Sequence, residues 1–144
     1  MTTTPAITLI RPAELATDVP YAYAAVAGAG RLVFTAGACP LDASGMTVAL
    51  GDVAGQARQV MANLVVTLAA AGAELSDVVK TTIYVASTRR QDLSVAWEVV
   101  REAFGDHDAP GTLLGVTVLG WEGQLVEVEA VAVLPAPQSP PAAG

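Results

Sequence analysis

The chain has 144 residues, enough for one domain with a proper hydrophobic core. Apolar residues make up 53% of it and charged residues only 15%, a balance that favours an oligomer in which a further apolar surface is buried. Fourteen acidic and seven basic residues give a net charge of −7, and there is no basic stripe. We therefore expect no nucleic-acid partner, because phosphate recognition needs positive charge.

No apolar run reaches the roughly 18 residues that a transmembrane helix needs, and the N-terminus lacks the pattern of a signal peptide, so we expect no membrane contact. Cys39 is the only cysteine, which excludes an internal disulfide bond and favours a reducing cytoplasm. We interpret it as a buried, inert thiol. Cys39 and the lone His107 have no partners at metal-ligand spacing, and no cofactor fingerprint is present. The sequence thus predicts a cytoplasmic protein with neither metal nor cofactor.

The N-terminal part of the chain predicts short strands separated by turns. Residues 6–10 form the first expected strand, after a loose tail. Residues 21–27 and 31–36 predict a β-hairpin around the glycine-containing turn between them. Tyr21 and Tyr23 lie two residues apart in its first arm, so both side chains would share one face. They could cover the sheet or place a hydroxyl at the mouth of a pocket, and both interpretations are open.

The next segment predicts a helix with one apolar stripe. Residues 46–50 are expected to form a short strand before it, Asp52 has the side chain of an N-cap, and Gly72 is expected to terminate the helix. The stripe consists of residues at helical spacing: Val53, Ala57, Val60, Met61, Leu64, Val65, Leu68 and Ala71. Polar residues take up much of the remaining surface: Gln56, Arg58, Gln59 and Asn63.

A strand, a helix and two more strands are expected after this helix. Residues 78–85 are a β-branched run typical of a central strand. Residues 89–104 predict a second helix that ends at Gly105. Residues 112–119 and 125–133 predict the last two strands.

This order of elements predicts an α+β fold, with a single mixed β-sheet and two helices packed on one face. The other face of the sheet would stay apolar and uncovered, so we expect subunit association to bury it. We expect the domain to cover residues 1–134. Residues 135–144 are rich in proline, cannot join a ladder, and are expected to be a disordered tail.

The last strand carries two carboxylates, Glu127 and Glu129, on the same face as the apolar Val131 and Val133. The opposite face of this strand is apolar: Val126, Val128, Ala130 and Ala132. Two interpretations are open. Either Glu127 or Glu129 faces water at a sheet edge, or one of them lines a pocket between sheets or subunits.

Five sequence blocks resemble, in the same order, the reactive intermediate deaminase family, also called the Rid or YjgF family. They lie at residues 31–37, 40–42, 56–63, 77–85, and 110–116 together with 125–132. The resemblance extends from about residue 20 to about residue 133. It implies the chorismate-mutase-like fold of that family, a homotrimer with a barrel-like core, and ligand clefts between neighbouring subunits.

The resemblance also implies site residues. In members that hydrolyse imines and enamines, an arginine before the first C-terminal strand binds the substrate carboxylate, and its position here is Gly111. The acid that positions or activates the hydrolytic water aligns with Glu127. The carbonyl that helps hold this water would belong to Leu113. The family's pocket tyrosine corresponds to Tyr21 or to Tyr23.

Three further positions belong to the implied site. The family's small polar residue after the third expected strand is replaced by Ala36, whereas the neighbouring Gly37 is retained. An asparagine of the second helix is replaced by Trp97. Other arginines could reach the cleft across a subunit interface: Arg31, Arg89 and Arg90.

Two functions are compatible with such a half-retained site. The first is hydrolysis of an imine or enamine without the usual carboxylate, with Glu127 as general acid and base. The second is a non-catalytic trimeric binding protein for a small apolar or weakly polar metabolite, with Tyr21 and Trp97 supplying contact area. We favour an enzyme of unknown substrate, because an acid among apolar residues costs energy to maintain. The ribonuclease activity attributed to some relatives is disfavoured by the acidic charge.

Overall fold

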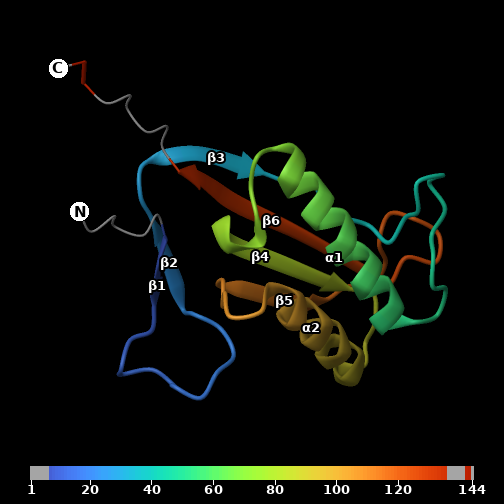
Figure 1. The fold of residues 1–144 in the computed structure, drawn as a ribbon. Coiled ribbons are helices and arrows are strands. Elements are labelled where there is room, and N and C mark those ends of the chain that lie inside the picture. The colour runs from blue at the N-terminus through green and yellow to red at the C-terminus, as the bar shows by residue number, and fades with distance from the viewer. Residues whose placement is uncertain (1–6, 136–141, 144) are drawn as a thin grey trace.

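The computed structural model describes residues 7–135 and 142–143. Its centre is a mixed sheet of four strands in the order β3-β6-β4-β5 (Figure 1). These strands are β3 (Gly30–Phe34), β6 (Val126–Pro135), β4 (Val78–Val85) and β5 (Gly111–Gly115). β6 runs antiparallel to β3 and β4, whereas β4 and β5 are parallel. A parallel pair needs a crossover, and α2 (Arg90–Phe104) supplies it.

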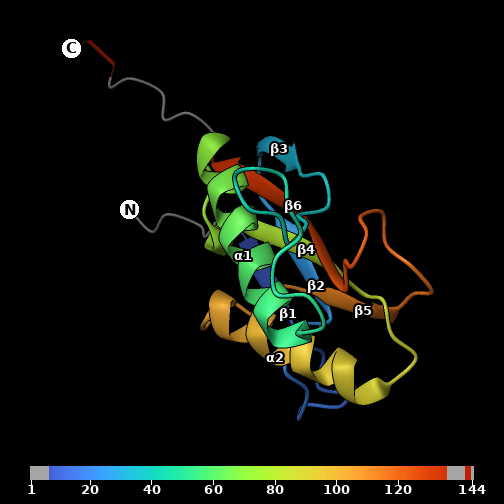
Figure 2. The ribbon, with the colours of Figure 1, turned by 90° about the vertical axis from the view of Figure 1, so that its right-hand side faces the viewer.

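Both helices lie on one face of this sheet (Figures 1 and 2). α1 (Val53–Ala70) packs on β6 and against α2, and a short 3₁₀ turn (Leu75–Asp77) leads into β4. The core forms between the layers, from alternate residues of the strands and one stripe of each helix. Its fully buried members include Val60, Leu64, Leu68, Ile83, Val85, Ala96, Val126 and Val128. The predicted α+β architecture, with two helices on one face of a mixed sheet, is confirmed.

The ends of α1 lie where the sequence predicts them. The carboxylate of Asp52 accepts a hydrogen bond from the Gly55 amide (3.0 Å), as expected of an N-cap. Gly72 has a φ of +85° directly after the helix, a conformation that favours glycine. The Ala73 amide donates to the Leu68 carbonyl (2.8 Å) and closes the helix in a Schellman motif.

The predicted hairpin between residues 21–27 and 31–36 is wrong. β2 (Ala24–Ala27) pairs with β1 (Ile7–Ile10) in a separate two-stranded ribbon, and β3 pairs with β6. β6 is ten residues long, and its second half pairs antiparallel with every residue of β3. That pairing outweighs a local turn, which the sequence pattern alone favours.

Two further strand predictions need correction. Residues 46–50 form no strand, because Ala49 and Gly51 adopt positive φ angles of 49° and 77° that break an extended path. β5 ends at Gly115 instead of residue 119, because β4 ends at the paired residue Val85 and leaves no partner beyond it. The last strand, β6, includes Pro135, one residue of the predicted tail. Residues 136–141 and 144 lie outside the described residues.

The sheet face opposite the helices exposes several large apolar side chains. Leu32 and Phe34 on β3 are 56% and 72% exposed, and Leu114 on β5 is 41% exposed. An apolar surface of this kind on a sheet is typical of an interaction site. No helix among the described residues combines the length and apolar character that crossing a membrane requires.

Candidate functional site

Glu127 and Glu129 lie on the sheet face opposite the helices, and they are not at a sheet edge. β6 is an inner strand, flanked by β3 and β4, so the first of the two open interpretations is excluded. Both acids are half-buried. Glu127 lies directly opposite Tyr84 in the ladder, and Glu129 accepts a hydrogen bond from the Tyr84 hydroxyl (2.8 Å). This bond to a carboxylate raises the pKa of Tyr84 above its ordinary value.

One oxygen of Glu127 is held by two donors. Its Oε1 accepts hydrogen bonds from the Cys39 thiol (3.0 Å) and from the Gln124 side-chain amide (3.2 Å). The other oxygen, Oε2, lies over Gly37, where an added Cβ would meet the carboxyl carbon at only 2.5 Å. Glycine at position 37 therefore leaves the space that this carboxylate occupies. We call Gly37, Cys39, Gln124 and Glu127 the Glu127 cluster.

Strand pairing and turn geometry assemble the cluster. Ala38 forms an antiparallel bridge with Val128, so its neighbours Gly37 and Cys39 share a face with Glu127. Gln124 is 4% exposed, and both polar atoms of its amide are used. Its Oε1 accepts from the Trp121 amide (3.1 Å), while its Nε2 also donates to the Val126 carbonyl (3.1 Å).

Side-chain amides of α1 hold the two segments that bring these partners to Glu127. Gln56 accepts from the Leu125 amide (2.7 Å) and donates to the Gly123 carbonyl (2.9 Å). Asn63 donates to the Cys39 carbonyl (2.8 Å) and to the Leu41 carbonyl (2.9 Å). Gln56 is fully buried, whereas the helical pattern placed it outside the apolar stripe. A buried amide satisfied at both ends is a structural tie between helix and loop.

The Cys39 thiol is a protonated donor near neutral pH. Burial, followed by the hydrogen bond and negative charge of Glu127, raises its pKa to about 11. A thiol in this state is a poor nucleophile, in keeping with the inert cysteine that the sequence predicts. Nothing in the sequence pattern, however, predicts that this thiol contacts the acid.

A second region, the Trp97 groove, lies along β5 and α2. Eight residues line it: Pro20, Tyr21, Ser94, Trp97, Glu98, Gly111, Thr112 and Leu113. The rings of Tyr21 and Trp97 meet edge to face, with centroids 6.1 Å apart and planes at 88°. The Tyr23 hydroxyl donates to the Ala16 carbonyl (2.8 Å) instead, so Tyr21 is the tyrosine at the groove.

Trp97 occupies the space into which a side chain at position 111 would extend. A Cβ added to Gly111 would lie 2.8 Å from the Thr81 hydroxyl and 3.4 Å from the Trp97 ring. Residues 97 and 111, the two positions at which the sequence resemblance predicts a difference, are therefore neighbours. The sequence alone does not place these two residues together, whereas the structure puts the indole within contact distance of a Cβ at position 111.

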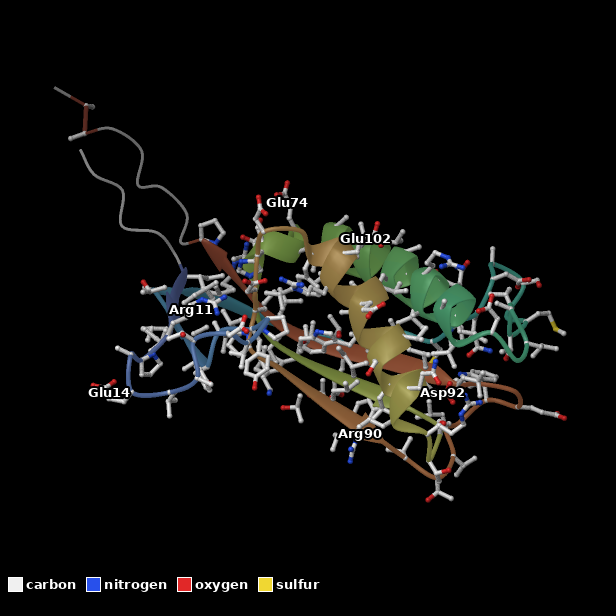
Figure 3. All side chains as sticks on the ribbon, turned by 90° about the horizontal axis from the view of Figure 1, so that it is seen from below. Arg11, Glu14, Glu74, Arg90, Asp92 and Glu102 are labelled. Atoms are coloured by element: carbon white, nitrogen blue, oxygen red, sulfur yellow. The ribbon has the colours of Figure 1, made fainter. Side chains whose placement is uncertain are left out.

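No arginine lines the Trp97 groove in the part of the chain that the structure describes. Arg31 lies on β3, at the sheet edge opposite β5. Arg89 and Arg90 lie at the start of α2, and Figure 3 shows Arg90 at the end of this helix opposite Glu102. Ala36 is exposed and follows β3, two residues before the bridge to β6.

The predicted site residues form two groups on opposite faces of one sheet. Glu127 and Gly37 lie on the face without helices. Gly111 and Leu113 pair with Thr81 and Ile83, which point toward the helices, and Trp97 comes from α2.

Within the described residues no group of three or more histidine, cysteine or acidic side chains is arranged to hold a metal ion.

Comparison with known proteins gives one consistent result. A family model described as endoribonuclease L-PSP matches residues 12–134. Protein DfrA of Myxococcus xanthus is 37% identical over 114 residues, which cover 79% of this chain and 85% of that protein. A human 2-iminobutanoate/2-iminopropanoate deaminase is 30% identical over 103 residues, which cover 72% of this chain and 73% of that protein. A solved structure from Yersinia pestis is described as a protein of unknown function of the Rid family. It has a TM-score of 0.81 at 30% identity, and the match covers 90% of this chain and 99% of that chain.

Proposed function

Because the chain belongs to the Rid (YjgF) family, whose model is described as endoribonuclease L-PSP, we propose that it hydrolyses a small imine or enamine to a carbonyl compound and ammonia. The single observation that carries the proposal is the Glu127 carboxylate, held through one oxygen and left with the other over Gly37. A carboxylate presented in this way can accept a proton from water and return it to nitrogen.

The proposed reaction needs only water and one acid–base group. Glu127 takes a proton from water as the water oxygen attacks the imine carbon, and the C=N π electrons move to nitrogen. Glu127 returns this proton to the nitrogen, which gives a carbinolamine, and then passes the hydroxyl proton of the carbinolamine to the same nitrogen, so that the C–N bond breaks with its electrons going to nitrogen and ammonia leaves. The oxygen that has lost this proton forms the C=O bond of the carbonyl product. The protonated Cys39 and the amide of Gln124 keep the carboxylate in place during these transfers.

We propose that two copies of the chain complete one cleft within a homotrimer. The Glu127 cluster and the Trp97 groove lie on opposite faces of the sheet, so one copy would supply the acid and its neighbour the groove. The exposed Leu32, Phe34 and Leu114 would be buried where the sheets of the three copies meet. Substitution of Phe34 by Glu is expected to give monomers by size-exclusion chromatography and to abolish hydrolysis.

The substrate is proposed to lack the usual carboxylate. Gly111 stands where an arginine would bind that group, Trp97 fills the space, and no arginine lines the groove in the described residues. Loss of a carboxylate–guanidinium contact costs on the order of 2–5 kcal/mol of binding. We therefore expect a neutral imine to be hydrolysed at a higher kcat/KM than 2-iminopropionate.

The test follows the loss of imines generated in situ. An amine oxidase supplies a neutral imine, an amino-acid oxidase supplies 2-iminopropionate, and trapping with semicarbazide reports the imine left over. Wild type should hydrolyse the neutral imine, and Glu127→Gln should lose about a hundredfold or more of that rate while keeping its circular dichroism and size. An unchanged rate in Glu127→Gln would remove this acid from the mechanism. A wild type inert toward both imines would leave the alternative function.

That alternative is a non-catalytic binding protein. The groove favours it, because Tyr21 and Trp97 offer aromatic contact area that needs no acid–base group. Ribonuclease activity is disfavoured by the net charge of −7.

A further inference from the structure

The charges around the Trp97 groove are predominantly negative. Glu98 is the charged residue among those that line it. The adjoining hollow on α2 has three acids, Glu98, Glu102 and Asp106, against Arg101. Nearby, Arg11 is neutralised by Asp108, with 2.6 Å between their charged atoms. An anion entering this region meets repulsion, and a cation meets attraction.

The aromatic residues of the groove offer what an organic cation needs. The perpendicular rings of Tyr21 and Trp97 form a corner, and the negative face of an aromatic ring attracts a cation placed over it. Quaternary and protonated amines are weakly hydrated cations that proteins often bind with aromatic rings and a nearby carboxylate. Here Glu98 can supply the carboxylate.

Two basic side chains bond to residues that line the groove. Arg11 donates to the Tyr21 carbonyl (2.7 Å) and is paired with Asp108. Lys80 donates to the Thr112 hydroxyl (2.6 Å), and Thr112 lines the groove. Thr112 pairs with Thr82, however, and so points to the sheet face opposite the helices, away from Trp97. The ammonium of Lys80 is thus on the other side of the sheet from the aromatic corner.

We propose that the Trp97 groove is a binding site for organic cations, with Tyr21 and Trp97 as the aromatic walls and Glu98 as the counter-charge. The inference deepens the proposed function by naming the substrate class as one that carries an ammonium group. Cation binding can be measured without turnover. If the cation-binding experiment fails, the proposed imine hydrolysis is still judged by its own assay, and the reverse also holds.

Three probes of one shape separate charge from size: choline, neutral 3,3-dimethyl-1-butanol, and anionic 3,3-dimethylbutanoate. The chain has two tryptophans, so a Trp121→Phe background leaves Trp97 as the only indole reporter. Choline should change its fluorescence and bind about threefold to tenfold more tightly than the alcohol. The butanoate should bind least tightly, and added salt should weaken choline binding alone.

Substitution of Glu98 by Gln should lower choline affinity about threefold and leave the alcohol unchanged. Glu14→Gln is the matched control, because Glu14 is an exposed acid on the N-terminal loop, away from α2 (Figure 3). Equal affinity for choline and the alcohol would reduce the groove to an apolar site and overturn the proposal. Butanoate binding that is lost in Lys80→Gln would overturn it in favour of an anion site.

Discussion

The Glu127 cluster and the Trp97 groove are built by different physical means. The cluster depends on directed hydrogen bonds, which run from α1 through the loops to one oxygen of a carboxylate. The groove depends on shape: two perpendicular rings, and a glycine whose missing Cβ would lie 2.8 Å from the Thr81 hydroxyl and in contact with the indole. The part that would do chemistry is thus positioned by polar ties, and the part that would select a ligand is formed by packing. The Glu127 cluster should tolerate little change, whereas the Trp97 groove can acquire a new specificity by paired substitutions.

The largest effect is expected from adding one methyl group to the cluster. In Gly37→Ala the new Cβ would lie 2.5 Å from the Glu127 carboxyl carbon, so this side chain must leave its position. We expect imine hydrolysis to fall about a hundredfold, as in the loss of a general acid–base group. Gly120→Ala is the matched control, because a Cβ there meets nothing within 4 Å. Similar rates for the two variants would mean that the observed position of Glu127 is not required.

Introducing an arginine at position 111 tests whether the groove is determined by packing. Gly111→Arg alone should destabilise the protein by up to about 3 kcal/mol, because its Cβ would lie 2.8 Å from the Thr81 hydroxyl and the longer side chain would have to pass the Trp97 ring, 3.4 Å from that Cβ. Adding Trp97→Asn should recover much of this loss and raise kcat/KM for 2-iminopropionate. Urea unfolding and the imine assay measure the two effects, with Trp97→Asn alone as the control. A double variant no more stable than Gly111→Arg would contradict the coupling.

Removal of the tie at Gln56 should weaken the whole cluster. In Gln56→Leu, the Leu125 amide and the Gly123 carbonyl lose their partner in a buried setting, at a cost of about 2 kcal/mol. Gln91→Leu is the control, since Gln91 is exposed on α2 and its loss should cost less than about 0.5 kcal/mol. Chemical denaturation of both variants checks the difference. Equal stabilities of the two variants would show that the hydrogen bonds of Gln56 make no net contribution to the free energy of unfolding.

The smallest effect is expected at Cys39. Cys39→Ala removes one of two donors to Glu127 and should lower kcat about threefold, whereas Cys39→Ser keeps a donor and should stay near wild type. The thiol pKa of about 11 means that the donor proton is retained as the pH rises, until the pH approaches that value. Between about pH 6 and 9 the wild-type and Cys39→Ser rate profiles should therefore run parallel. A wild-type fall in that range that Cys39→Ser lacks would show that the thiolate forms earlier.

Much of the fold follows from local sequence patterns. The two helices, the caps at Asp52 and Gly72, and the strands of the C-terminal half agree with their predictions within a few residues. The failures occur where a distant segment competes with a local signal. The turn at residues 28–30 indicates a hairpin, yet β3 finds its partner about a hundred residues later in β6.

The amino-acid sequence by itself determined the α+β class and the side chains present at positions 97 and 111, because apolar periodicity and residue identity are local properties. Tertiary structure alone decided that the indole fills the space beside Gly111, and that Cys39 and Gln124 hold Glu127. Those contacts join segments up to 88 residues apart in the chain. Their existence depends on strand register and on the buried amides of α1, which no single stretch of sequence encodes.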